Sequence, residues 1–139
     1  MNSVKTFLRS VRTLDSMIDR KQRQYERLAE LRTKAESSTV SLNPMKVQTS
    51  HTNSNEDVLI KIIDLQYEIN ADIDRYCTKK REAMAIIDAL EDERHRVLLY
   101  AYYLEGKKWE EVAVMMNYSW RHLHRLHSEA LQAIGTSCH

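Results

Sequence analysis

The sequence predicts an all-α protein in which a long antiparallel coiled-coil helical hairpin precedes a small helix-turn-helix domain. The chain of 139 residues contains only two Gly and one Pro, whereas the residues that favour helices are plentiful. Two long stretches place apolar residues at alternating spacings of three and four, which is typical of a coiled-coil seam. A third stretch, near the C-terminus, has the spacing of a short helix, a tight turn and a longer helix.

The first long helix is predicted over residues 3–36. At 1.5 Å per residue it would be about 50 Å long. Its strict seam indicates pairing with another helix rather than one face of a globular core. The seam positions are Val4, Phe7, Val11, Leu14, Ile18, Lys21, Tyr25 and Leu28, with Leu31 continuing the stripe.

A linker is predicted over residues 37–55, where Ser, Thr and Asn dominate and Pro44 interrupts a helix. Its length indicates either a mobile loop or a contact surface. Ser54 and Asp57 then have the spacing of a capping box and are predicted to open a second long helix. That helix has the seam Leu59, Ile62, Leu65, Ile69, Ile73, Tyr76, Lys80, Ala83, Ile87 and Leu90.

The two long helices are predicted to fold back as an antiparallel pair that forms an oligomerisation domain over residues 1–90. Lys21 and Lys80 lie in the seams, where they would either fix the register and oligomeric state or extend to solvent. The paired acids Asp72 and Asp74 are expected on a solvated helix face. Because a pair of helices leaves one apolar side partly open, a homodimer is expected.

Residues 91–135 are predicted to form the second domain, followed by a tail at 136–139. Its first helix, 92–104, ends before Gly106, a residue suited to the position after a helix. A short helix follows over 109–116. Ser119 is then predicted to cap a longer helix over 120–134.

The last helix is the candidate DNA-binding element, because the second helix of a helix-turn-helix enters the major groove. Its predicted buried face comprises Leu123, Leu126, Ala130, Leu131 and Ile134. The predicted DNA-binding residues are Ser119, Trp120, Arg121, His124, Arg125 and Ser128. Trp120 has two interpretations: contact with a thymine methyl group or sugar, or packing on the preceding turn through Tyr118.

These residues resemble region 4 of the bacterial sigma-70 family. Leu90, Val97-Leu98, Tyr103-Leu104-Glu105-Gly106, Glu110-Glu111-Val112-Ala113, Ser119, Leu123, Leu126 and Ala130-Leu131 match its three helices. Lys108 stands where a Ser or Thr usually caps the middle helix, and His122 and His124 replace residues that are commonly Thr, Lys or Arg.

Nearly the whole chain is similar to small sigma-like transcriptional regulators of phages and prophages of Gram-positive bacteria. The matching segments are Val47-Gln48-Thr49-Ser50, Ile63-Asp64-Leu65, Glu68-Ile69, Trp109 to Ala113, Tyr118-Ser119 and Leu126 to Leu131. The resemblance implies a sigma region 4-like fold and DNA binding. It also implies that His127, in the motif L-H-x-x-A-L, forms a hydrogen bond within the fold.

Charge and cysteine content restrict the function further. Residues 1–36 carry nine Lys and Arg against five Asp and Glu, whereas residues 91–139 carry six against seven. The predicted DNA-binding end is therefore not basic overall, which disfavours tight nonspecific binding. Cys77 and Cys138 are too few for a disulfide framework, which favours a reducing cytoplasm, here that of a bacterial host. The N-terminus has no apolar signal-peptide region, and no stretch is long enough to span a membrane.

No catalytic, cofactor-binding or metal-binding set is predicted. His122, His124 and His127 have no Cys or acid that completes a tetrahedral site, and no Gly-rich loop could hold a phosphate. We therefore expect a protein that is not an enzyme: a sequence-specific regulator that binds double-stranded DNA and acts with host RNA polymerase. The alternatives are a DNA-packaging adaptor like a phage small terminase, and a helix-turn-helix module that binds and inhibits a host protein complex.

Overall fold

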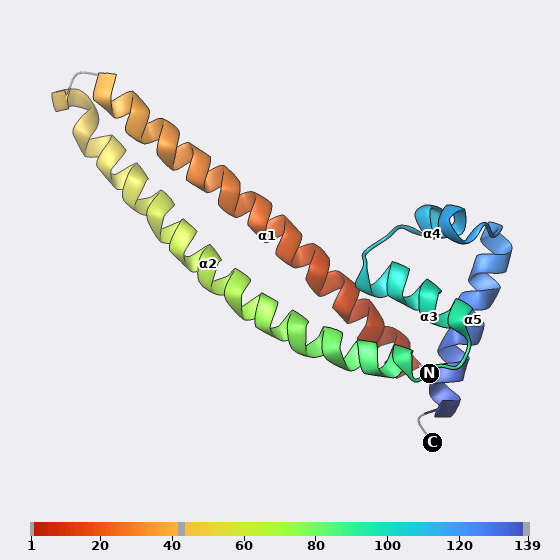
Figure 1. The fold of residues 1–139 in the computed structure, drawn as a ribbon. Helices are drawn as coiled ribbons and strands as arrows, with labels where there is room; N and C mark the ends of the chain where they lie inside the picture. The colour runs from red at the N-terminus through yellow and green to blue at the C-terminus, as the bar shows by residue number, and fades with distance from the viewer. Residues whose placement is uncertain (1, 42–43, 138–139) are drawn as a thin grey trace. The chain divides into compact units, whose positions relative to one another are not determined.

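All secondary structure in the described part of the chain is helical. The computed structural model describes the backbone of residues 2–41 and 44–137, and the side chains of residues 3–34 and 55–136. The elements, shown in Figure 1, are α1 (Asn2–Ser41), α2 (Pro44–Asp88), α3 (Glu93–Leu99), the π-helical turn η1 (Tyr100–Leu104), α4 (Trp109–Met116) and α5 (Trp120–Ser137).

Helices α1 and α2 extend into the segment for which the sequence indicates a linker. Helix α1 reaches Ser41 and α2 begins at Pro44, so the helix start predicted at the Ser54–Asp57 capping box is wrong. Proline is favoured at the first position of a helix, where its missing N–H is not needed. Pro44 therefore opens α2 instead of interrupting it. Residues 42–43 and the side chain of Ser54 lie outside the described residues.

The chain divides into two compact units, and both long helices contribute to each. Unit 1 comprises residues 1–16 and 74–139, and unit 2 comprises residues 17–73. This division differs from the predicted boundary at residue 90, because the first turns of α1 and the last turns of α2 supply side chains to the core of unit 1. Leu8, Val11, Ala83 and Ile87 are all fully buried there.

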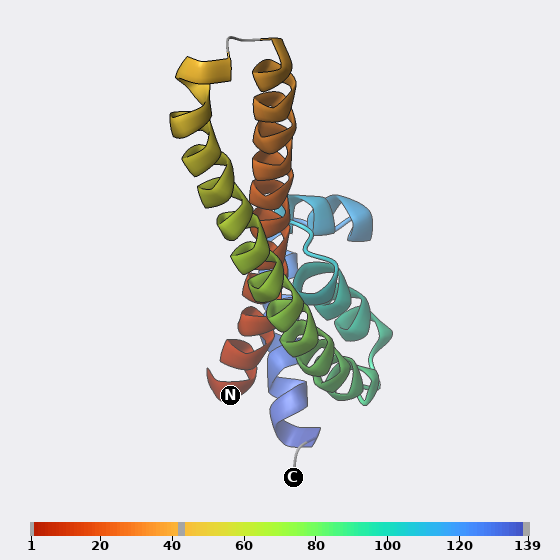
Figure 2. The same ribbon diagram turned by 90° about the vertical axis from the view of Figure 1, so that its left-hand side faces the viewer.

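In unit 2 the segments of α1 and α2 lie side by side and run in opposite directions (Figure 2). Ile18, Ile62, Leu65 and Ile69 are buried, as their seam positions predict. Leu31, predicted to continue the seam, is instead 54% exposed.

A buried ion pair crosses between the two helices of unit 2. Lys21 Nζ lies 2.7 Å from Asp72 Oδ2, and Asp72 is only 1% exposed. The expectation of a solvated Asp72 is therefore wrong. A carboxylate is buried only where a positive charge or hydrogen bonds compensate for its lost hydration, and Lys21 provides that compensation from the other helix.

The core of unit 1 brings together the start of α1, the end of α2 and all the elements that follow. Its central residues, besides those of α1 and α2, are Leu98, Leu99, Ala101, Tyr103, Leu104, Val112, Leu123, Leu126, Ala130 and Ile134. Burial of this apolar surface is the main force that holds α5 in place.

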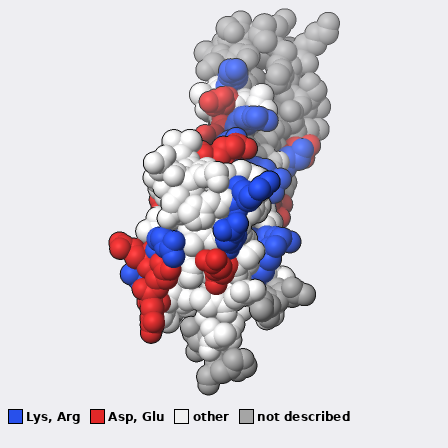
Figure 3. All heavy atoms as spheres, turned by 90° about the vertical axis from the view of Figure 1, so that its right-hand side faces the viewer, with Lys and Arg blue, Asp and Glu red and all other residues white. Residues whose placement is uncertain are grey.

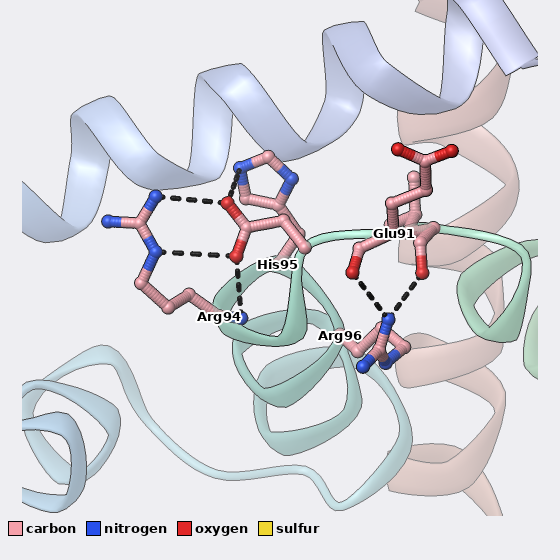
Figure 4. Close-up of polar contacts among 6 residues, drawn as sticks. Glu91, Arg94, His95 and Arg96 are labelled. Atoms are coloured by element: carbon pink, nitrogen blue, oxygen red, sulfur yellow. Dashed lines mark hydrogen bonds and ion pairs between the residues drawn. The ribbon is translucent and has the colours of Figure 1, made fainter.

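Polar contacts fix the start of α3 after the short turn that follows α2 (Figure 4). Asp92 is the N-cap, and its carboxylate accepts the backbone N–H of Arg94 at 2.9 Å. The Arg94 side chain also donates to this carboxylate, and these hydrogen bonds lower the pKa of Asp92 to about 2. The guanidinium of Arg96 donates to the carbonyls of Leu90 and Glu91, so the turn itself is held.

The chain then widens into the π-helical turn η1, which the sequence did not indicate. The N–H of Glu105 donates to the carbonyl of Tyr100 at 2.8 Å, five residues back. Within this turn Tyr103 is 2% exposed, whereas Val97 of the preceding α3 is 40% exposed. Gly106 ends the turn with φ +72°, as its predicted position after the helix requires.

Candidate nucleic-acid interface

The start of α5 is defined by a tight turn and a side-chain cap. Asn117, which ends α4, adopts the left-handed conformation with φ 58°, one that Asn tolerates better than most residues. Two residues later, Ser119 Oγ accepts the backbone N–H of His122 at 3.2 Å. This bond confirms Ser119 as the N-cap of α5 and fixes Trp120 as its first residue.

Helix α5 has one buried face and one exposed face, divided as its sequence predicts. All the residues predicted to be buried are buried: Leu123, Leu126, Ala130, Leu131 and Ile134. All the predicted DNA-binding residues are exposed: Ser119, Trp120, Arg121, His124, Arg125 and Ser128. We call these six residues the α5 row. Five of them lie on the exposed side of α5 and Ser119 caps its start, and their role in DNA binding stays a prediction.

The α5 row has two positive charges and no negative one. In the described part of the chain no ion pair holds Arg121 or Arg125, so both guanidinium groups can bind an external acceptor. On the face formed by α4 and α5, Lys and Arg side chains lie beside a broad uncharged area, and Asp and Glu lie both along one edge and among the Lys and Arg side chains (Figure 3). Arg94 adds no free charge here, because Asp92 pairs with it at 2.9 Å.

Aromatic contacts support the N-terminal half of the α5 row. The rings of Trp120 and His124 meet at a steep angle, with centroids 4.4 Å apart. His124 in turn lies 5.7 Å from Trp109 of α4, and Trp109 stacks on Tyr102 at 3.8 Å. Tyr118 stacks on His122 at 4.1 Å. The ring of Tyr118 therefore supports His122, and the ring contact of Trp120 among the described residues is with His124.

His127 belongs to the core rather than to the α5 row. It is 7% exposed, and its Nε2 lies 2.8 Å from Tyr103 Oη, which confirms the expected hydrogen bond within the fold. Burial, with smaller contributions from the positive charges of Lys5 and Arg9 and from His124, lowers the pKa of His127 to about 4. The ring is consequently neutral near pH 7.

Sequence reasoning missed Arg12, which connects α1 to the support of this surface. Its guanidinium donates to the carbonyls of Tyr102 and Lys107, at 2.6 and 3.0 Å, and lies 4.0 Å from the centroid of the Tyr102 ring. These partners are about ninety residues away in sequence, so no local pattern could have indicated them.

The described residues form neither a metal site nor a membrane span. No group of three or more His, Cys, Asp or Glu there could hold a metal ion. Within the same residues no helix is both long and apolar enough to cross a membrane. Cys77 carries an exposed free thiol.

Together these observations define an all-helical protein with an exposed, basic and aromatic helix face. The chain belongs to the family described as "Protein of unknown function (DUF1492)", which matches residues 36–135. No curated protein and no solved structure matches the chain.

Proposed function

We propose that this protein binds double-stranded DNA through the α5 row and acts as a sequence-specific transcriptional regulator. The observation that carries the proposal is the division of α5: one face is held in the core of unit 1, and the opposite face presents Arg121 and Arg125, which form no ion pair with another described residue. Guanidinium groups bind guanine O6 and N7 in the major groove and also bind phosphates. A helix of about 10–12 Å diameter fits the major groove, which is about 12 Å wide.

In this proposal α4, the Asn117 turn and α5 form a helix-turn-helix similar to sigma-70 region 4, and the paired α1 and α2 form an antiparallel coiled-coil hairpin. The tight left-handed turn and the Ser119 cap support the first assignment. The buried seam residues of unit 2 support the second. The resemblance to phage and prophage regulators suggests action on promoters with host RNA polymerase, in the bacterial cytoplasm.

The proposal includes a homodimer formed through unit 2. Two paired helices leave apolar side chains of α2 open: Ile60, Ile63 and Tyr67 are 56%, 47% and 73% exposed. A second copy would cover part of this surface, and a dimer would present two α5 helices to two half-sites. Sedimentation velocity that finds a monomer at every concentration would contradict this part of the proposal.

The experiment is selection of bound duplexes from a random pool with the full chain, followed by affinity measurements on the selected site. Arg121→Ala and Arg125→Ala should each weaken specific binding by about 1–3 kcal/mol if the side chain reads a base. Arg81→Ala is the matched control, because Arg81 is an exposed arginine of unit 1 on α2. Unchanged affinity of both α5 variants would refute the assignment of the α5 row.

One observation favours the alternative of a protein-binding module. A shallow hollow of unit 1 is lined by Val97, Tyr100, Met115, Arg96 and the acids Asp88, Glu93 and Glu105. Exposed apolar side chains bordered by carboxylates are typical of a protein-binding surface. If the random pool yields no enriched duplex, this alternative replaces DNA binding.

A further inference from the structure

Trp120 is a large apolar side chain that the core of unit 1 does not use. It is 55% exposed at the first position of α5, although the other large apolar side chains of that helix are buried. An exposed tryptophan exposes a large apolar area to water, which has a cost in free energy. Its position in the α5 row, beside Arg121, places it where the helix would first meet base edges.

The ring of Trp120 is held in place although it is exposed. The His124 ring contacts it in a T-shaped arrangement, with centroids 4.4 Å apart and an angle of 68° between the rings. Behind His124, Trp109 and Tyr102 form a parallel stack at 3.8 Å, with 15° between their planes. Arg12 lies over the Tyr102 ring on the α1 side. A side chain ordered before binding loses little conformational entropy when it contacts a ligand.

We propose that Trp120 contacts the 5-methyl group of a thymine in the major groove and thereby sets a thymine preference within the bound site. This inference rests on the proposed DNA-binding function and adds a specificity to it. The methyl group of thymine is the one large apolar feature that the four bases present in that groove. A flat indole, in ring contact with His124, offers apolar surface to it. Arg121, one position along, is suited to a neighbouring guanine.

The test uses the duplex selected with the full chain and replaces each thymine singly by deoxyuridine. Deoxyuridine keeps the base pair and the O4 acceptor but lacks the methyl group. Burial of one methyl group corresponds to about a fourfold change in affinity. We expect one or two positions to show a loss of about that size with the unaltered protein, and no loss at those positions with Trp120→Ala. Met84→Ala is the control, since Met84 is a partly exposed apolar residue of unit 1 on α2.

The outcomes separate the inference from the function on which it rests. Three results would each overturn the role of Trp120 alone: a selected site without thymine, an affinity that no deoxyuridine changes, or an equal loss in the unaltered protein and Trp120→Ala. A chain that binds no duplex would overturn DNA binding, and this inference with it. Loss of methyl sensitivity in Met84→Ala would show that the effect does not come from the α5 row, and would also overturn the inference.

Discussion

Acidification should destabilise unit 1 through a single buried histidine. His127 is 7% exposed and shares a hydrogen bond with Tyr103, and its pKa in the folded chain is about 4. In the unfolded chain an imidazole titrates near 6.5. Between these two values the unfolded chain binds more protons than the folded chain, so the free energy of unfolding falls as the pH falls. The stabilisation is complete above about pH 6.5 and is lost progressively towards pH 4.

The magnitude follows from the difference between the two pKa values. A shift from 6.5 to about 4 corresponds to roughly 3 kcal/mol at full protonation. Carboxylates in unfolded chains titrate near pH 4, so the informative window for a histidine lies higher. Between pH 7 and pH 5, His127 alone should remove about 2 kcal/mol from the free energy of unfolding.

Urea denaturation followed by circular dichroism at pH 7, 6 and 5 measures this loss. In His127→Gln the side chain can still bond to Tyr103 but does not titrate, so its pH dependence over the window should be smaller by about 2 kcal/mol. His122→Gln is the matched control, because His122 is an exposed histidine of the same helix. If His127→Gln and the unaltered protein lose equal stability between pH 7 and pH 5, the buried neutral imidazole is not the cause.

Two further predictions concern stability. Lys21→Ala should lower the free energy of unfolding by about 1–3 kcal/mol, because it leaves the buried Asp72 carboxylate without its 2.7 Å partner. The double variant Lys21→Met/Asp72→Leu should be more stable than Lys21→Ala in the same urea titration. Equal stabilities of the two variants would contradict the ion-pair argument. Gly106→Ala should lower the free energy of unfolding by about 1 kcal/mol, because alanine is strained at a φ of +72°. Crowding is not the cause, since the added Cβ would meet Asp15 Oδ2 at an ordinary 3.5 Å. Gly106→Asn should lose less stability in thermal unfolding, and a larger loss for Asn would indicate crowding instead of backbone strain.

The faces of the helices could be predicted from sequence because burial follows a local period. Val11 and Ile18 in α1, Ile69 and Ile87 in α2, and Leu126 in α5 are all buried where the spacing places them. Each of these predictions uses only the spacing of apolar side chains three and four residues apart on the same helix. The exposure of the α5 row follows from the same rule, since it is the face opposite the buried stripe.

Features that depend on a distant partner could not be predicted in this way. Asp72 has the same local surroundings as a solvated acid, and its partner Lys21, which compensates for its burial, is fifty-one residues away. The π-helical turn is also invisible to a helical period, because it inserts residues into the repeat and changes which side chains face inward.

Among these distant contacts, the one between Arg12 and Tyr102 supports the candidate interface. Trp120 rests on His124, and the stack behind His124 includes Tyr102, whose carbonyl and ring both bind Arg12 of α1. The first turns of α1 therefore hold the chain between η1 and α4, and they also contribute Leu8 and Val11 to the core against which α5 packs. A fragment beginning at residue 91 would contain the whole α5 row and yet lack this support. The positions of the row are thus set by a helical period of a few residues, whereas its rigidity depends on side chains at the opposite end of the sequence.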